Sequence, residues 1–456
     1  MPKKKTALTI EERLQQALVP AEEQPYEVPK NWVWVRLGAV CFFENGYAFK
    51  SDKFSSEKGI PVIRISNIKE NNVDLDDCIK TLEENIDEKF IVHQGDLLIA
   101  MSGATTGKNG VYMSANIAYL NQRVGNIKVK NKELLIEKFR NFYIANMQNE
   151  ILNTAYGGAQ PNISSQKMSV MTFPLPPLSE QQRIVERIEE LFAKLDEAKE
   201  RLQEAADSFA VRKAAILHKA FTGELTTQWR RENGVSDESW EEKTISKICG
   251  SLKYGTSKKS SDSGEVVVLR MGNLQNGEID WSNLAYTSDE EDIKKYLLKP
   301  GDILFNRTNS PELVGKTSIY RGEMPAIYAG YLIKLDYEKN IIVGDYLNYY
   351  LNSSKAKEYY MQVKTDGVSQ SNINAKKIGE FEIPLPTLSE QHEIVRLIND
   401  LLARERAAKQ ATEQALASVD LMKKSILARA FCGELGTNKA SEASALELLR
   451  QVLAEN

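Results

Sequence analysis

The sequence predicts a mixed α/β chain in which two globular domains alternate with two long helices that pair as an antiparallel coiled coil. The first observation is a repeat: "PLPPLSEQQRIVERIEELF" at Pro174–Phe192 returns as "PLPTLSEQHEIVRLINDLL" at Pro384–Leu402, 210 positions later. The second is that "KAFTGELTT" at Lys219–Thr227 returns as "RAFCGELGT" at Arg429–Thr437 with the same offset. The constant offset is expected of a helix, because one extra residue would rotate everything beyond it by about 100°. We therefore expect an internal repeat with approximate two-fold symmetry.

Each repeat carries the start and stop signals of one long helix. Ser179 and Ser389 follow proline-rich segments and are the expected N-caps, and Gln182 completes a capping box with Ser179. Gly223 and Gly433 are the expected ends of the helices. Each helix then has about 44 residues and a length of roughly 65 Å.

Apolar residues recur within both helices at alternating steps of four and three, which is the heptad pattern of a coiled coil. The alternative is a pair of ordinary amphipathic helices within globular cores, but these average about a dozen residues. Glu405 and Thr412 replace apolar residues in the second copy, so we expect a weaker or wetter seam there. The predicted seam consists of Ile184, Ile188, Leu191, Leu195, Leu202 and Phe209 in the first helix, and Ile394, Ile398, Leu401 and Val419 in the second.

The bulk composition is that of a globular protein. A length of 456 residues suggests about three compact units, and 42% hydrophobic with 27% charged residues is typical of soluble chains. We find no apolar run long enough to cross a bilayer and no secretory signal behind the first residues. The four cysteines form no CxxC pair, so we expect reduced thiols and a cytoplasmic location.

The repeats divide the chain into alternating segments. Residues 1–28 are an expected N-terminal helical segment, and residues 434–456 an expected helical tail. The others are a first variable domain at 29–173, a first long helix at 174–223, a linker at 224–240, a second variable domain at 241–383 and a second long helix at 384–433.

The two variable domains also repeat each other, more loosely. "GDLLIAMSGATTGK" at Gly95–Lys108 matches "GDILFNRTNSPELVGK" at Gly301–Lys316, and "GGAQPNIS" at Gly157–Ser164 matches "DGVSQSNIN" at Asp366–Asn374. Each domain is expected to be mixed α/β. The expected strands include Val62–Ile65, Asp96–Ala100, Val266–Leu269 and Asp302–Phe305, and the expected helices include Glu137–Asn149 and Asp345–Tyr360.

The residues that catalysis would need are mostly missing. Neither "GATTGKN" nor "SPELVGKT" meets the phosphate-loop pattern, and no GxGxxG, NPPY or DPPY segment is present. The three histidines lie at no metal-ligand spacing. We therefore predict no catalytic residue, no metal site and no enzyme activity of the chain by itself.

The loops instead suggest recognition of DNA. Small and hydrogen-bonding residues follow a predicted strand in both domains, and Gln, Asn and Arg can contact base edges while Ser, Thr and Lys hold phosphates. The alternative is that these are glycine-rich turns without a special role. The candidate DNA-binding residues are Ser102, Thr105, Thr106, Lys108, Gln160 and Asn162 in the first domain, and Arg307, Thr308, Asn309, Lys316, Ser369, Gln370 and Asn372 in the second.

The doubled "PLPPLSEQ…IV", the doubled "AF.GEL" and the "GDLL" and "GDIL" segments resemble the specificity subunit of a type I restriction–modification system. The resemblance implies two target-recognition domains, each specific for one half of a bipartite DNA site, with the paired helices setting the spacer. It also implies docking of two adenine-N6 methyltransferase subunits that use S-adenosylmethionine. Two restriction and translocation subunits that use ATP and Mg²⁺ complete the complex, and this chain is expected to bind no cofactor. A competing hypothesis is a non-catalytic coiled-coil tether whose end domains bind proteins.

Overall fold

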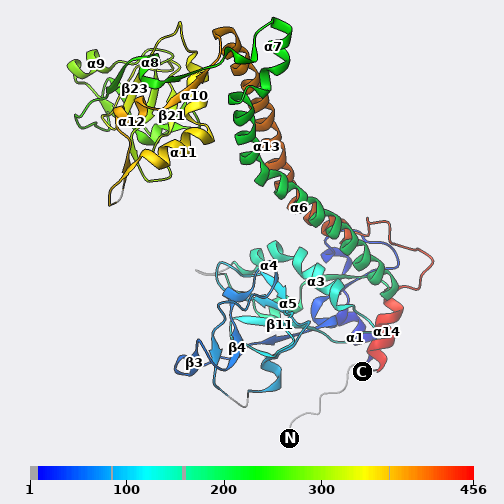
Figure 1. Ribbon diagram of the computed structural model, residues 1–456. Coiled ribbons are helices and arrows are strands. Elements are labelled where there is room, and N and C mark those ends of the chain that lie inside the picture. Colours follow the sequence, from blue (N-terminus) through cyan, green and yellow to red (C-terminus); the bar gives the residue numbers. More distant parts are fainter. Residues whose placement is uncertain (1–8, 84–85, 157–160, 369, 456) are drawn as a thin grey trace. The chain divides into compact units, whose positions relative to one another are not determined.

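The computed structural model describes residues 9–83, 86–156, 161–368 and 370–455, and it divides the chain into two compact units (Figure 1). Unit 1 contains Met1–Arg201 and Ala415–Asn456, and unit 2 contains Leu202–Gln414. The two longest elements are the helices α6 (Leu178–Phe221) and α13 (Leu388–Phe431), each of 44 residues. The division falls inside both helices, so each unit contains one half of α6 and one half of α13.

The ends of α6 and α13 confirm one part of the sequence prediction and correct another. Gly223 and Gly433 both adopt the left-handed conformation, with φ of 79° and 75°, just beyond the last helical residues. The predicted N-caps are wrong, because Ser179 lies inside the first turn of α6 and Ser389 inside the first turn of α13. Thr387 caps α13 instead: its Oγ1 accepts a hydrogen bond from the Glu390 backbone N–H at 3.4 Å.

The predicted capping box is wrong for the same reason. The Gln182 side chain does not reach back to the helix start but donates to Glu186 Oε1 at 2.9 Å, one turn further along. In α6 the residue before the helix is Pro177, which has no capping side chain. Its carbonyl accepts from the backbone N–H groups of Glu180 and Gln181.

A buried glutamine explains much of the repeated motif. Gln181 donates to the carbonyls of Leu134 and Pro176 at 2.9 and 3.0 Å and accepts from the Ile136 N–H at 2.9 Å. Gln391 makes the same three bonds in unit 2, to Ile341, Pro386 and Val343. Both side chains are fully buried. Each glutamine therefore attaches the start of a long helix to the segment that precedes a helix of the same domain. That helix is α3 (Glu137–Asn146) in unit 1 and α10 (Gly344–Leu351) in unit 2.

The phenylalanine at the end of each long helix explains the second repeated motif. Phe431, the last residue of α13, packs edge-on against Phe139 and Tyr143 of α3 with ring centroids 5.4 and 4.9 Å apart. Phe221, the last residue of α6, packs in the same way against two tyrosines of α10. Each long helix thus ends in the aromatic core of a unit, and such pairs contribute beyond the area that they bury.

The described residues of unit 1 form two five-stranded sheets and a two-stranded pair. The pair is β1 (Val33–Arg36) with β12 (Thr172–Leu175), antiparallel. The first sheet has the order β2 (Cys41–Asn45), β11 (Val124–Val129), β8 (Leu97–Ala100), β9 (Asn109–Val111) and β5 (Asn71–Asn72). The second has the order β3 (Phe54–Ser55), β6 (Lys80–Thr81), β4 (Ile60–Ile63), β10 (Ala118–Leu120) and β7 (Ile91–Val92).

Unit 2 repeats this plan, which confirms the predicted mixed α/β fold with an internal repeat. The pair is β13 (Glu241–Thr244) with β26 (Glu382–Leu385), antiparallel. One sheet has the order β14 (Cys249–Tyr254), β23 (Leu332–Tyr337), β19 (Ile303–Asn306) and β21 (Thr317–Ile319). Another has the order β18 (Tyr286–Thr287), β15 (Val266–Leu269) and β22 (Ala326–Tyr328).

The predictions gave the approximate positions of the strands and domain helices, but not their exact ends. All four predicted strands occur within a few residues of the expected positions, as β4, β8, β15 and β19. Each predicted domain helix is in fact two helices: α3 is followed by α4 (Gln148–Ala155), and α10 by α11 (Ser354–Val363). The breaks at Met147 and Asn352 were missed because the apolar pattern continues through them.

The two long helices pack against each other with opposite directions in both units. In unit 1, Lys199 pairs with Asp420 at 3.2 Å, and Lys423 pairs with Asp196 at 2.5 Å. In unit 2, Arg212 pairs with Glu405 at 2.9 Å. As the residue numbers rise along α6, those of their partners in α13 fall, which confirms the antiparallel pairing. Glu405, one of the two polar residues in the expected seam, is thus used for an ion pair at the edge of the helix pair.

Burial along the seam differs between the ends and the middle of each helix. Ile184 and Ile188 are fully buried in the core of unit 1, and Ile394 and Ile398 are fully buried in the core of unit 2. Phe209 and Val419 are also buried. Leu191, Leu195, Leu202 and Leu401 are only partly buried. Partial exposure is expected where a residue is covered by one partner helix and by no domain.

The two ends of the chain meet in unit 1. Helix α1 (Ile10–Ala17) begins with a capping box formed by Thr9 and Glu12. It lies against α14 (Ala445–Glu455), with Arg13 Nη1 donating to the Leu453 carbonyl at 3.3 Å and Arg450 paired with Glu11 at 3.4 Å. All four cysteines are free thiols. Among the residues described, no helix is long and apolar enough to span a membrane.

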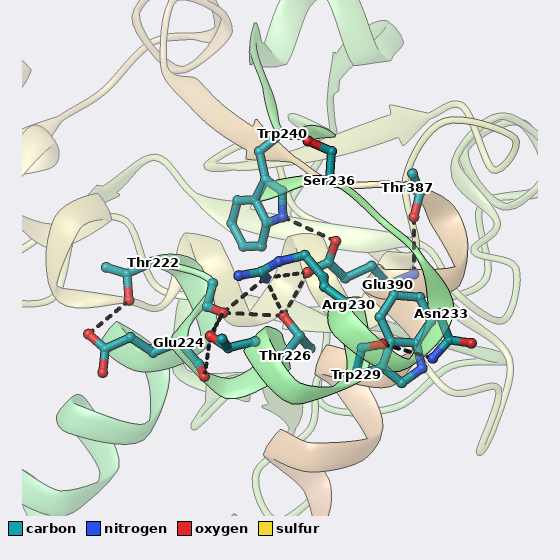
Figure 2. A network of polar contacts seen from close by, with 12 residues as sticks. Thr222, Glu224, Thr226, Trp229, Arg230, Asn233, Ser236, Trp240, Thr387 and Glu390 are labelled. Carbon is teal, nitrogen blue, oxygen red and sulfur yellow. Dashed lines mark hydrogen bonds and ion pairs between the residues drawn. The ribbon is translucent and has the colours of Figure 1, made fainter. Parts of the chain in front are cut away.

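A buried ion pair holds the start of α13 in unit 2 (Figure 2). Glu390 is fully buried, and its Oε1 lies 2.7 Å from Arg230 Nη1 and accepts from Thr226 Oγ1 at 2.6 Å. Its Oε2 accepts from Trp240 Nε1 at 3.1 Å. Arg230 lies on α7 (Thr227–Asn233), inside the segment that the sequence suggests is a linker. Residues 224–240 are thus folded against α13 in this unit.

The equivalent carboxylate of unit 1 keeps a tryptophan partner, and an asparagine donates to it where Glu390 has the arginine. Glu180 Oε2 accepts from Trp32 Nε1 at 2.8 Å and from Asn438 Nδ2 at 2.7 Å. The nearby Arg183 forms its ion pair with Glu442 at 2.8 Å, so Glu180 is held by neutral donors. Burial raises the pKa of Glu180, although the hydrogen bonds from Trp32 and Asn438 oppose that shift.

We expect Arg230→Met to destabilise unit 2 by about 3–5 kcal/mol, because it leaves the buried Glu390 carboxylate without its cation. Urea unfolding followed by tryptophan fluorescence measures the change. Arg183→Met is the matched control: the Arg183–Glu442 pair keeps about a quarter of each side chain exposed, so its loss should cost about 1 kcal/mol or less. Equal losses of unfolding free energy in the two variants would contradict the view that the buried Arg230–Glu390 pair matters more than the partly exposed Arg183–Glu442 pair.

We expect Glu180→Gln to remove a pH dependence of stability. Because the folded-state pKa of Glu180 is raised, the folded chain keeps this proton to a higher pH than the unfolded chain. The associated stability is fully present below the ordinary value of 4.5 and is lost as the pH rises through the folded pKa. The unfolding free energy of the unmodified chain minus that of Glu180→Gln should therefore fall over the range from about pH 4.5 upward. A constant difference in urea titrations across that range would refute the raised pKa.

Candidate nucleic-acid interface

The two candidate loops of the first domain come together in unit 1. Ser102, two residues after β8, forms an isolated antiparallel bridge with Asn162. The Gly103 N–H donates to the Pro161 carbonyl at 3.0 Å, and Ile163 N–H donates to the Met101 carbonyl at 2.9 Å. Gln160, the remaining candidate of the second loop, lies outside the described residues. Segments about 60 residues apart in the sequence thus form one surface.

The corresponding loops also meet in unit 2. Thr308 pairs with Asn372 between the short strands β20 (Thr308–Asn309) and β25 (Ser371–Asn372), and Asn372 Nδ2 donates to Thr308 Oγ1 at 2.7 Å. The Ile373 N–H donates to the Arg307 carbonyl at 2.9 Å, as Ile163 does to Met101 in unit 1. Gln370 is exposed beside this pair, whereas Ser369 lies outside the described residues.

A third segment joins the surface in each unit, and the sequence analysis missed it. The turn between β10 and β11 carries Gln122 and Arg123, both exposed, and the Arg123 carbonyl accepts from the Met101 N–H at 3.0 Å. The equivalent turn of unit 2 places the Tyr331 carbonyl 3.1 Å from the Arg307 nitrogen. The available signal was the position of "NQR" and "AGY" between two apolar strands in both halves of the chain.

The three segments of unit 1 enclose an open pocket of about 530 Å³. Amide, hydroxyl and guanidinium groups line much of it, and Ser102 Oγ is buried there without a partner among the described residues. Such donors and acceptors match those on the edges of bases and on phosphates. The polar residues that line it are Asn45, Ser102, Gln122, Arg123, Asn162, Ser164 and Ser165.

The other predicted residues lie in different surroundings. Thr106 is buried and donates to the Gly103 carbonyl within its own loop at 2.7 Å, and Thr105 Oγ1 is buried without a described partner. Lys108 lines a separate groove of unit 1 beside Lys423 and Lys424.

Two candidates of unit 2 are also held by their own unit. Lys316 Nζ donates to Gln275 Oε1 at 3.0 Å, and Asn309 Oδ1 accepts from the Ser310 N–H at 2.8 Å. The structure thus gathers Ser102 with Asn162, and Arg307 with Thr308 and Asn372. It places Lys108 and Lys316 in other contacts.

The part of the chain that the structure describes contains no group of three or more His, Cys, Asp or Glu side chains that could hold a metal ion. The polar lining of the unit 1 pocket supplies amide, hydroxyl and guanidinium groups. Such groups can bind DNA and discriminate between bases.

Comparisons with known proteins agree with this geometry. A family model described as "Type I restriction modification DNA specificity domain" matches residues 29–206 and 237–416. The chain is 28% identical over 454 residues to the type I restriction enzyme EcoBI specificity subunit of Escherichia coli, covering 93% of this chain and 92% of that one. It is 26% identical over 451 residues to the EcoKI specificity subunit of Escherichia coli strain K12, covering 94% and 96%.

Two solved structures share the fold. One is the HsdS subunit from Thermoanaerobacter tengcongensis, with a TM-score of 0.61 and 20% identity, covering 91% of this chain and 100% of that chain. The other comes from a study titled as the structural basis of complex assembly and conformational transition of the type I R-M system. Its TM-score is 0.65 at 19% identity, and it covers 90% of this chain and 100% of that one.

Proposed function

Because the chain belongs to the family of type I restriction–modification DNA specificity domains, with both of its halves matched, we propose that it is the DNA-recognition subunit of such a system. In this proposal it performs no catalysis and directs the partner subunits to their DNA site. The relatives named above are specificity subunits of type I restriction enzymes, and the alignments span nearly their whole length.

Each unit recognises one half of a bipartite DNA site. The observation that carries this proposal is the convergence of the same three loops in both units, with Ser102 beside Asn162 in one and Thr308 beside Asn372 in the other. The equivalent loops carry different side chains, so the two half-sites need not have the same sequence. A homodimer has two identical recognition surfaces and binds a palindromic site. Duplication within one chain supplies two surfaces that can differ, so the site need not be palindromic.

The paired helices set the number of unspecified base pairs between the half-sites. Support comes from α6 and α13, which are both unbroken over 44 residues and both contribute to each unit. A continuous helix has a fixed rise per residue, so its length is a fixed quantity in a way that a flexible linker is not.

The partners follow from the same assignment. Two methyltransferase subunits dock on the helices and the adjoining repeats, and two restriction and translocation subunits complete the assembly in the cytoplasm. S-adenosylmethionine, ATP and Mg²⁺ belong to those subunits, and this chain binds none of them.

Selection of bound duplexes from a random DNA pool tests the proposal. The pool is presented to the chain alone and to the chain prepared with its methyltransferase subunit. We expect enrichment of two short conserved segments separated by a constant number of unspecified base pairs. Absence of any enriched sequence from both preparations would contradict the proposal and favour a protein-binding tether.

A further inference from the structure

We propose that unit 2 recognises a guanine through Arg307, whose guanidinium is held in place by the ring of Tyr254. This inference rests on the proposed function and goes beyond it by naming a base, a residue and its support. Arginine donates two hydrogen bonds to the O6 and N7 atoms of guanine in the major groove, which no other base accepts in that pattern.

The backbone of Arg307 is fixed on both sides. Its N–H donates to the Tyr331 carbonyl at 3.1 Å, and its carbonyl accepts from the Ile373 N–H at 2.9 Å. It directly follows the buried strand β19 and directly precedes Thr308, which pairs with Asn372. The side chain therefore leaves the surface at a defined point between the three converging segments.

The guanidinium is also fixed, while the donors that a base needs stay available. Its Cζ lies 4.8 Å from the centroid of the Tyr254 ring, and its buried Nε has no hydrogen-bond partner within the described part of the chain. Among the described residues, Arg307 forms no ion pair with a carboxylate. Contact between a guanidinium face and an aromatic ring leaves the terminal N–H groups pointing along the edge of the plane, where a bidentate acceptor binds. Less side-chain entropy is lost on binding when the side chain is already placed.

Comparison with unit 1 indicates that this is a specific feature of unit 2. The strand registers make Met101 the counterpart of Arg307 and Asn45 the counterpart of Tyr254, while Arg123 is the counterpart of Tyr331. The same backbone hydrogen bond occurs in both units: Met101 N–H donates to the Arg123 carbonyl, and Arg307 N–H donates to the Tyr331 carbonyl. In unit 1 the arginine, Arg123, supplies the carbonyl of this hydrogen bond, whereas in unit 2 the arginine, Arg307, supplies the N–H. Arg123 provides a matched arginine that belongs to the other half-site.

The test compares Arg307→Gln, Arg307→Lys, Tyr254→Leu and the control Arg123→Gln in the full chain prepared with its methyltransferase subunit. Each preparation selects duplexes from a random DNA pool, and affinity is then measured on the selected site and on its single-base variants. We expect the unmodified chain to prefer guanine at one position of one half-site. Arg307→Gln should reduce that preference roughly 5- to 150-fold and leave the other positions unchanged.

The two remaining substitutions at this site distinguish recognition from folding. Lysine keeps the charge but not the planar fork, so Arg307→Lys should lose most of the discrimination while retaining non-specific binding. Tyr254→Leu should weaken the guanine preference by a smaller factor. Arg123→Gln should change only the other half-site.

An unchanged guanine preference in Arg307→Gln and Arg307→Lys, in a chain that still selects a bipartite site, would overturn this inference and leave the proposed function standing. A chain that selects no sequence at all would overturn both. Loss of discrimination in both half-sites at once would also count against a local role of Arg307.

Discussion

Exchange of residues 29–171 for the corresponding segment of a relative with another specificity is expected to change one half of the recognised DNA site and to leave the other half unchanged. The exchanged segment contains Ser102, Gln122, Arg123 and Asn162, and no residue of the unit 2 loops. Because specific sites are typically bound about 10³-fold or more tightly than non-specific DNA, the original half-site should lose nearly all of its contribution. Sequencing of DNA selected by the hybrid chain measures the result.

The donor segment must keep the residues that fasten the domain to the long helices. These are Phe139 and Tyr143, which pack on Phe431, and the backbone around Leu134 and Ile136 that bonds Gln181. The reciprocal exchange, of residues 241–381, is the control and should change only the other half-site. A change of both half-sites by either exchange would contradict independent recognition by the two units.

Insertion of one heptad into the middle of both α6 and α13 is expected to lengthen the spacer by about three base pairs. Seven residues add about 10.5 Å of helix, and one base pair of B-DNA occupies about 3.4 Å. A whole heptad keeps the apolar seam in register, so the helix pair should remain folded. The base sequences of the two half-sites should not change, because the insertion does not alter the candidate recognition loops.

A matched insertion separates an effect of helix length from an effect of added chain. Seven residues placed in the exposed turn near Ser263 of unit 2 should leave the spacer as it was. An unchanged spacer after the double helix insertion would argue against the helix pair as the element that sets the spacing. A spacer altered by the loop insertion would argue against it as well.

The large elements could be predicted from the sequence because they carry long-range regularity. The constant offset of 210 residues located both long helices, and Gly223 and Gly433 located their ends. The start of each helix was misplaced because Ser179 and Ser389 look like caps. The side chain that caps α13 belongs to Thr387, and the first copy has proline there.

The candidate recognition surface was only partly predictable, for a physical reason. The loops around Ser102 and Asn162 could be found because both halves repeat them. Whether a side chain in them faces the surface depends on tertiary contacts: Thr106 bonds its own loop, and Lys316 bonds Gln275. Arg123 was missed because a three-residue turn between strands has no distinctive composition. The roles of Glu180 and Gln181 were missed because buried polar pairs form across more than 40 residues of sequence.

The most direct measurement is methylome sequencing of a host that carries this gene together with those of its partner subunits. Methylated adenines are expected in a single bipartite motif with two unlike halves and a spacer of constant length. A contiguous or palindromic motif, or a spacer that varies from site to site, would contradict the proposal that two different surfaces recognise the DNA and that the helix pair sets their spacing.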